Sequence, residues 1–168
     1  MTQKPKAKYR HVLSVDIVGL SRPILTEEEQ AQKIEILNRS LMECEVFKNV
    51  QKEEMILRQT GDGFIIGASG DPTFPIELAI QLQEKLQQYN QTLDIKHQIK
   101  IRMGIHSGTS YQVKGLTEDE WGDAFIGATR VMSVGKSDHI LLSSKTALEL
   151  IHLSTRYEQI LHSIGEYT

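Results

Sequence analysis

The hydrophobic positions of this chain follow two spacings, one typical of strands and one typical of helices. Residues 10–18 and 98–108 alternate apolar and polar side chains, which predicts two strands. Two short apolar runs, at 53–60 and 63–69, lie on either side of Gly61-Asp62-Gly63. Because three residues between short apolar runs are typical of a tight antiparallel hairpin, these runs predict a pair of adjacent strands.

Apolar residues recur at helical spacing in four segments: residues 25–47, 75–90, 123–135 and 144–153. In the first segment, Thr26 and Glu29 have the spacing of a capping box and acids fill the first turn, so we expect a helix to begin there. A further apolar run at residues 139–144 predicts a short strand between the last two helices.

The predicted order of elements is β-α-β-β-α-β followed by an appended α-β-α element. This order predicts an α+β fold built on the ferredoxin-like split βαβ unit. Residues 1–9 are polar and basic, and we expect a flexible N-terminal arm there, with residues 10–168 forming one domain. Because this fold supports many unrelated activities, the function must be argued from the site.

Composition narrows the class of protein. With 168 residues, of which 39% are hydrophobic, the chain is long enough for one domain with a substantial core. A net charge of -3 offers no basic surface for nucleic acid, and no apolar run approaches the roughly 20 residues of a membrane helix. The single cysteine, Cys44, cannot form an internal disulfide, which favours a reducing compartment. We therefore expect a cytoplasmic protein with no nucleic-acid partner and no membrane segment in this chain.

Two carboxylates stand at positions that chemistry can use. Asp16 lies at the end of the first predicted strand and Asp62 at the tip of the hairpin, and in this fold the two strands are neighbours. Two like charges a few ångströms apart repel unless a cation lies between them, and Mg²⁺ or Mn²⁺ takes carboxylate and phosphate oxygens as ligands. The backbone N–H groups of residues 18–21, beside a helix start, would favour phosphate. Taken singly, a Gly-Asp-Gly hairpin turn and a strand-end aspartate are ordinary structural features.

Four blocks carry a resemblance to a known family: "VLSVDIVGLS", "RQTGDGFIIG", "IRMGIHSG" and "WGDAFIGATRVM...HILLSS". In this order they resemble the catalytic domain of class III nucleotidyl (adenylate/guanylate) cyclases over about residues 10–165. The resemblance implies the class III cyclase fold and a head-to-tail homodimer with shared active sites. It also implies two divalent metal ions (Mn²⁺ or Mg²⁺) and attack of the ribose 3′-hydroxyl of a nucleoside triphosphate on its α-phosphate, with release of pyrophosphate.

The resemblance assigns roles to particular residues. Asp16 and Asp62 match the two metal-binding aspartates, and the carbonyl of Ile17 matches a further metal contact. The phosphate loop is matched by Gly19, Leu20 and Ser21. Arg130 matches an arginine that stabilises phosphate charge in catalysis.

The base-recognition positions differ from both main classes of the family. Where adenylate cyclases tend to carry Lys and guanylate cyclases Glu, this chain has Arg58, while Asp119 matches the aspartate of adenylate cyclases. Arg58 cannot accept a hydrogen bond, so it does not replace the glutamate that reads guanine. Its planar fork together with Asp119 is compatible with uracil or cytosine, and adenine remains open through Asp119.

A second departure concerns the ribose, because Ile126 replaces the family asparagine that orients it. Loss of such a hydrogen-bonding group favours slow turnover, a different arrangement, or an inactive site. The stand-alone domain and the "GDGF" and "HILLS" runs are similar to small bacterial Pycsar-type pyrimidine cyclases, which make cyclic UMP or CMP as an antiphage signal. We therefore expect a lyase that cyclises UTP or CTP. The alternatives are an adenylate cyclase and a catalytically degenerate domain that binds nucleotide or dimerises.

Overall fold

A computed structural model describes residues 4, 6–117 and 119–166 of the chain. The strands are β1 (Ala7–Ile17), β2 (Met55–Gln59), β3 (Gly63–Ala68), β4 (Ile101–Val113), β5 (Asp119–Trp121) and β6 (Ile140–Leu142). The helices are α1 (Glu27–Met42), α2 (Glu45–Asn49), α3 (Phe74–Asn90), α4 (Asp123–Ser133), α5 (Ser144–Leu153) and α6 (Thr155–Ile160), with a 3-10 turn at Lys52–Glu54. The first strand begins at Ala7, three residues earlier than predicted, and residues 1–3 and 5 of the expected arm lie outside the described residues.

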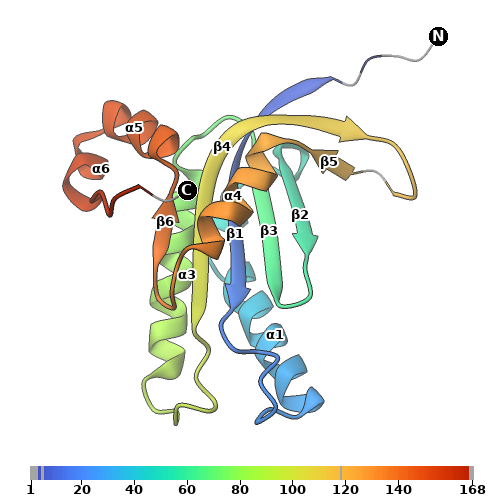
Figure 1. Ribbon diagram of the computed structural model, residues 1–168, viewed down its shortest axis with the longest axis vertical. Coiled ribbons are helices and arrows are strands. Elements are labelled where there is room, and N and C mark those ends of the chain that lie inside the picture. Colours follow the sequence, from blue (N-terminus) through green and yellow to red (C-terminus); the bar gives the residue numbers. More distant parts are fainter. Residues whose placement is uncertain (1–3, 5, 118, 167–168) are drawn as a thin grey trace.

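The strands form one sheet in the order β2-β3-β1-β4-β5, and β6 pairs in parallel with β4 (Figure 1). The neighbours along this path pair antiparallel, so β1 and the β2–β3 hairpin lie side by side as predicted. The predicted α+β fold with its split βαβ core and appended α-β-α element is confirmed. Short elements were missed: α2, β5 and α6 have five, three and six residues, too few for a periodic pattern to stand out.

One face of the sheet packs against α1 and α3, and the other against α4 (Figure 1). The start of α1 is capped as expected, because the Thr26 hydroxyl accepts a hydrogen bond from the backbone N–H of Glu29 at 3.1 Å. Alternation along β1 places Leu13 and Val15 in the core under α1 and α3. The alternate residues of β1 point to the α4 face, where Val12 packs against Ala124, Phe125 and Ala128.

Helix α4 lies unusually close to the sheet, and Gly104 of β4 is the reason. A Cβ added at Gly104 would lie 2.4 Å from the carbonyl oxygen of Ala128 and 2.3 Å from the backbone nitrogen of Met132. Only glycine allows this approach. With 11 residues, α4 spans about 16 Å along the sheet, and its two ends adjoin the two groups of candidate site residues.

None of the helices in the described part of the chain combines the length and the apolar composition that crossing a bilayer requires.

Candidate active site

The end of β1 and the turn of the β2–β3 hairpin meet at one edge of the sheet, which we call the carboxylate edge. Asp16 pairs in register with Gly63, and the backbone N–H of Ile17 donates to the carbonyl oxygen of Asp62 at 2.8 Å. Asp16 is buried, with 6% of its surface exposed, whereas Asp62 is exposed at the turn. The structure therefore brings Asp16 and Asp62 together, as the sequence predicted from topology, with Ile17, which only the family resemblance indicated, beside them.

Arg102 of β4 is a member of this edge that the sequence reasoning missed. It pairs in register with Asp16, and its guanidinium bonds both carboxylate oxygens, Nε to Oδ1 at 2.8 Å and Nη2 to Oδ2 at 2.9 Å. The hydrogen bonds with Asp16 raise the pKa of Arg102, helped by the charges of Asp16 and Asp62 and opposed by burial. The signal was present in the alternation of β4. Ile101 and Met103 point into the core, which leaves Arg102 on the face of the sheet that Asp16 shares.

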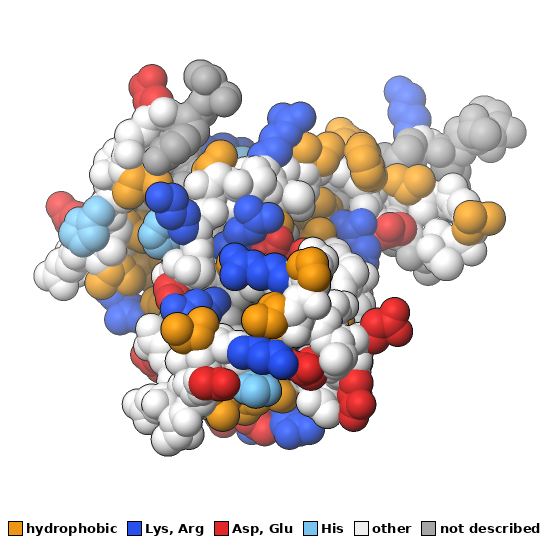
Figure 2. Space-filling view, turned by 60° about the horizontal axis from the view of Figure 1, so that its bottom comes forward, with side chains coloured by type: hydrophobic (Ala, Val, Ile, Leu, Met, Phe, Trp, Pro, Cys, Tyr) orange, Lys and Arg blue, Asp and Glu red, His pale blue; other side chains and the backbone are white. Residues whose placement is uncertain are grey.

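A cavity of about 760 Å³ opens at the carboxylate edge. Its wall includes Asp16, Asp62 and Arg102, the whole of the predicted phosphate loop with Gly19, Leu20 and Ser21, and Lys136 from the α4–β6 loop. In Figure 2, where this end of the molecule comes forward, Lys and Arg side chains gather near the centre of the face. The cavity wall therefore combines two carboxylates, the positive charges of Arg102 and Lys136, and the backbone of the loop at residues 18–21.

The predicted phosphate loop turns at Gly19. Its φ of 73° lies in the left-handed region, which favours glycine. A Cβ there would lie 2.7 Å from the guanidinium Nε of Arg22, so the side chain of Arg22 packs across the turn. The turn therefore needs glycine for both its backbone conformation and its contact with Arg22.

Two carboxylates side by side suit a divalent ion. No group of three or more His, Cys, Asp or Glu side chains suited to a metal occurs among the described residues. A Mg²⁺ or Mn²⁺ ion nevertheless needs only one or two carboxylates when substrate phosphates complete its shell. The guanidinium of Arg102 shows that this carboxylate pair attracts a cation, since it bonds Asp16 and also feels the charge of Asp62. The residues present therefore fit a divalent ion held together with a phosphorylated ligand.

Arg58 and Asp119 lie together at a second place, which we call the base edge after the role predicted for these two residues. The Nη1 of Arg58 donates to Oδ2 of Asp119 at 3.2 Å, joining β2 to β5 across the curled sheet. The guanidinium carbon of Arg58 lies 4.4 Å from the ring centroid of Phe125, in the first turn of α4. Nε of Arg58 is buried and finds no hydrogen-bond partner within the described part of the chain. Arg58 is thus held on an aromatic ring with donor capacity to spare.

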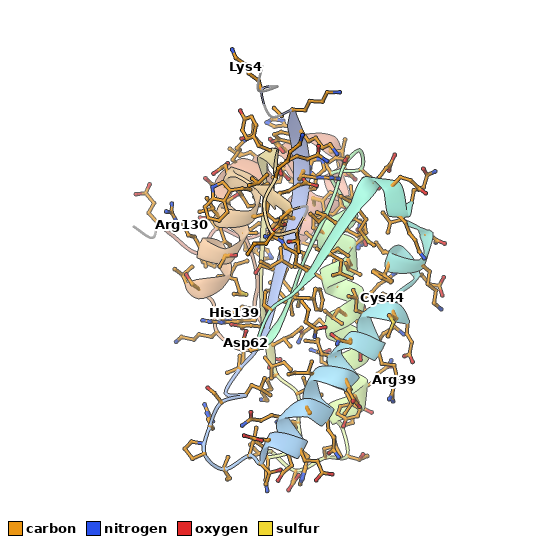
Figure 3. The ribbon with its side chains drawn as sticks, turned by 90° about the vertical axis from the view of Figure 1, so that its right-hand side faces the viewer. Lys4, Arg39, Cys44, Asp62, Arg130 and His139 are labelled. Carbon is orange, nitrogen blue, oxygen red and sulfur yellow. The ribbon has the colours of Figure 1, made fainter. Side chains whose placement is uncertain are left out.

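The two edges lie apart in one copy of the chain. Neither Arg58 nor Asp119 lines the cavity, because the base edge adjoins the first turn of α4 while Arg102 contacts the carbonyl of Ser133 at its end. Arg130 is exposed on α4 and points away from the turn that carries Asp62 (Figure 3). Ile126 is half-buried on the same helix. The structure therefore divides the predicted site residues into two groups.

Comparison with known proteins places this geometry in a family. The family model for the adenylate and guanylate cyclase catalytic domain matches residues 11–164. A search of curated proteins finds no match.

Solved structures share the fold. An adenylate/guanylate cyclase/hydrolase from Silicibacter pomeroyi matches with a TM-score of 0.68 at 21% identity, covering 90% of this chain and 85% of that one. The monomeric guanylyl cyclase domain of the RhoGC fusion protein from the aquatic fungus Blastocladiella emersonii matches with a TM-score of 0.71 at 17% identity, over 89% and 90% of the two chains. The guanylate cyclase domain of RhGC from Catenaria anguillulae, in complex with GTP, has a TM-score of 0.65 at 18% identity, over 86% and 84%. These likenesses confirm the class III cyclase fold.

Proposed function

Because the chain belongs to the family of adenylate and guanylate cyclase catalytic domains, we propose that it is a nucleotidyl cyclase that acts on a pyrimidine nucleoside triphosphate. UTP or CTP would be converted to the 3′,5′-cyclic monophosphate and pyrophosphate. The observation that carries the proposal is the contact of Arg58 with Asp119. Asp119 matches the aspartate of adenylate cyclases, but Arg58 differs from both the lysine and the glutamate that read purines in the relatives that the sequence resembles. As in the Pycsar-type cyclases that the chain resembles, the cyclic product would serve as an antiphage signal.

The carboxylate edge would hold the metal ions and the triphosphate. Asp16, Asp62 and the carbonyl of Ile17 would bind two divalent ions, Mg²⁺ or Mn²⁺. Divalent ions bound there supply Lewis-acid activation of the attacking hydroxyl and neutralise phosphate charge. The loop at Gly19, Leu20 and Ser21 would bind phosphate through its backbone N–H groups, while Arg102 and Lys136 add positive charge to the cavity wall.

The separation of the two edges supports a shared site. In a head-to-tail homodimer, Arg58, Asp119 and Arg130 of one copy would face the cavity of a second copy. Arg130 would then stabilise charge on the phosphates without touching Asp62 of its own chain. A dimeric form, called non-canonical, is known for the guanylyl cyclase domain of the RhoGC fusion protein, which shares this fold.

The base edge supports a pyrimidine through its donors and acceptor. Uracil offers two carbonyl groups and one N–H, so the guanidinium fork of Arg58 would donate to a carbonyl while the carboxylate of Asp119 accepts from the N–H. Binding would exchange the single hydrogen bond between Arg58 and Asp119 for bonds to the base. Cytosine and adenine would each satisfy Asp119 through an amino group, which keeps CTP as a second pyrimidine and ATP as the purine alternative.

Ile126 favours a different candidate, a degenerate cyclase domain that binds nucleotide without turning it over. A half-buried isoleucine cannot hydrogen-bond the ribose where the family has asparagine. Retention of Asp16, Asp62 and Arg130 favours chemistry over this alternative.

The test is a direct assay of the purified protein with Mn²⁺ and each of ATP, GTP, CTP and UTP, with products resolved by chromatography. We expect cyclic UMP or cyclic CMP as the main product. A cyclic product from ATP alone would overturn the pyrimidine assignment, and no product from any nucleotide at high protein concentration would overturn the enzyme assignment.

A further inference from the structure

Beneath the base edge lies a buried ion pair between residues far apart in the sequence. Arg10 of β1 and Glu120 of β5 are only 2% and 7% exposed. Their contact is bidentate, with Nε of Arg10 at 2.9 Å from Oε1 of Glu120 and Nη2 at 2.7 Å from Oε2. Ser110 of β4 donates to the same carboxylate at 2.8 Å. The pair therefore joins three strands under one charge-assisted network.

Arg10 also reaches toward the other edge of the sheet, where β2 and β3 lie. Its Nη1 donates to the carbonyl oxygen of Glu54 and to the hydroxyl of Ser69, both at 2.7 Å. Glu54 directly precedes β2, the strand that carries Arg58, and Ser69 directly follows β3. One side chain of the central strand β1 thus ties the strand of Arg58 to the strand of Asp119.

The network continues from Glu120 into the base edge itself. The backbone N–H of Glu120 donates to Oδ1 of Asp119 at 2.8 Å, which leaves Oδ2 to accept from Arg58. Strand β5 has only three residues, and its register pairs Glu120 with Gln112. So short an edge strand has few other contacts to fix its position, and the side chain of Glu120 is its buried anchor.

Stability alone does not explain such a pair. A buried ion pair can be replaced by apolar residues of similar volume with little loss of stability, and sometimes with a gain, because desolvation offsets the attraction. Burial opposes the charge of Glu120, but the hydrogen bonds from Arg10 and Ser110 and the charge of Arg10 outweigh it and lower its pKa. Glu120 is therefore held in its charged form beside Arg10, and its backbone N–H links the pair to Asp119.

We infer that Arg10 and Glu120 are a positioning pair that holds Asp119 against Arg58 and thereby sets the base selectivity of the site. The inference rests on the proposed role of Arg58 and Asp119 as the residues that read the base. Neither Arg10 nor Glu120 touches the nucleotide. They act by fixing how far apart, and at what angle, the donor fork and the acceptor carboxylate are presented.

Two variants test the pair through selectivity. Glu120→Gln removes one charge of the pair and keeps most of the shape, and we expect a roughly tenfold loss in preference for the favoured nucleotide, measured as the ratio of kcat/KM values among the four triphosphates. Glu77→Gln is the matched control, because Glu77 is also ion-paired, but with Arg156 of α6 and not with Arg10. The double variant Arg10→Met/Glu120→Leu removes both charges at similar volume, so it is expected to fold with a melting temperature near that of the parent while losing selectivity. Parental selectivity in the double variant would overturn the inference.

A second readout is independent of turnover. Trp121 is the only tryptophan of the chain and belongs to β5, next to Glu120, so its fluorescence reports how that strand is seated. We expect both pair variants to shift the emission of Trp121 and its quenching by acrylamide, whereas Glu77→Gln leaves them unchanged. If the parent makes no cyclic product, the proposed function fails while the Trp121 result still decides whether the pair positions β5. An unaltered Trp121 signal in both pair variants would contradict the inference.

Discussion

At one end of α4, Asp16 and Asp62 face a cavity of about 760 Å³, whereas at the other end Arg58 and Asp119 face each other above a buried ion pair. The carboxylate edge is open, and one of its aspartates is held by Arg102 while the other is exposed. The base edge is closed over a network that spans β1, β2 and β5. In the account proposed above, the first edge needs a ligand to complete its charges, while the geometry of the second edge is set before any ligand binds. Catalytic loss should therefore follow substitutions at the first edge, and altered choice of base should follow those at the second.

The largest effect is expected from Asp62→Asn at the open edge. Removing the negative charge deprives the divalent ions of a ligand, and cyclase activity should fall by roughly 10³-fold while the fold is kept, because Asp62 is exposed at a turn. Initial rates of product formation measure this, with circular dichroism to confirm folding. Glu84→Gln, an exposed acid on α3, is the control and should leave the rate unchanged.

Arg58→Ala should reduce discrimination among nucleotides and leave the binding of divalent ions unchanged. Loss of the guanidinium fork removes a donor to the base, so discrimination among nucleotides should fall by about 10- to 100-fold, while the Mn²⁺ concentration needed for half-maximal activity stays nearly constant. Arg39→Ala, on the exposed face of α1, serves as the matched control. Unchanged selectivity would remove Arg58 from base recognition and weaken the contrast between the edges.

Arg102→Met tests whether the open edge is held by a competing cation. The guanidinium of Arg102 bonds both carboxylate oxygens of Asp16. Removing this guanidinium should therefore strengthen the binding of Mn²⁺ without nucleotide by roughly 3- to 10-fold, as measured by titration calorimetry. The control is Lys136→Met, which removes a positive charge from the cavity wall. Weaker Mn²⁺ binding in Arg102→Met would show that the guanidinium supports the site in place of competing for it.

The smallest effect is a pH dependence that belongs to the closed edge. The pKa of Glu120 is lower in the folded protein than its ordinary value of 4.5, so its contribution to stability is present above that value and is lost as the pH falls through the folded pKa. Melting temperatures between pH 7 and pH 3 should fall more steeply for the parent than for Glu120→Gln, by a few degrees. If the melting temperatures of the two proteins fall in parallel with pH, the partners of Glu120 do not lower its pKa in the folded protein.

The sequence predicted what depends on alternation and topology. The meeting of Asp16 with Asp62 followed from the strand order, because a hairpin beside β1 must bring its turn to the end of that strand. The approach of Arg58 to Asp119 came from family resemblance, since nothing in their spacing of 61 residues indicates it. The Arg10–Glu120 pair was beyond sequence reasoning, because charged residues are usually exposed and these two are 110 positions apart.

Two further features were hard to predict from the sequence: very short strands and the role of single side chains. Strand β5 has too few residues to show a period, yet it carries Asp119 and sets the position of the base edge. Arg102 was within reach, because alternation along β4 places it on the face of Asp16, but no motif pointed to its role. The physical reason is common to these cases: tertiary contacts between distant strands decide where single polar side chains lie.

If the two edges work together across a pair of chains, as proposed, two inactive variants should restore activity when they are mixed. Asp62→Asn and Arg130→Ala should each be inactive alone, because every shared site then lacks either a metal ligand or the arginine. When the two proteins are mixed and allowed to exchange subunits, half of the dimers contain one of each, and each mixed dimer has one intact site. Activity should therefore recover to about one quarter of the parental rate. A mixture as inactive as its components, although mixed dimers form, would contradict a site shared between two copies.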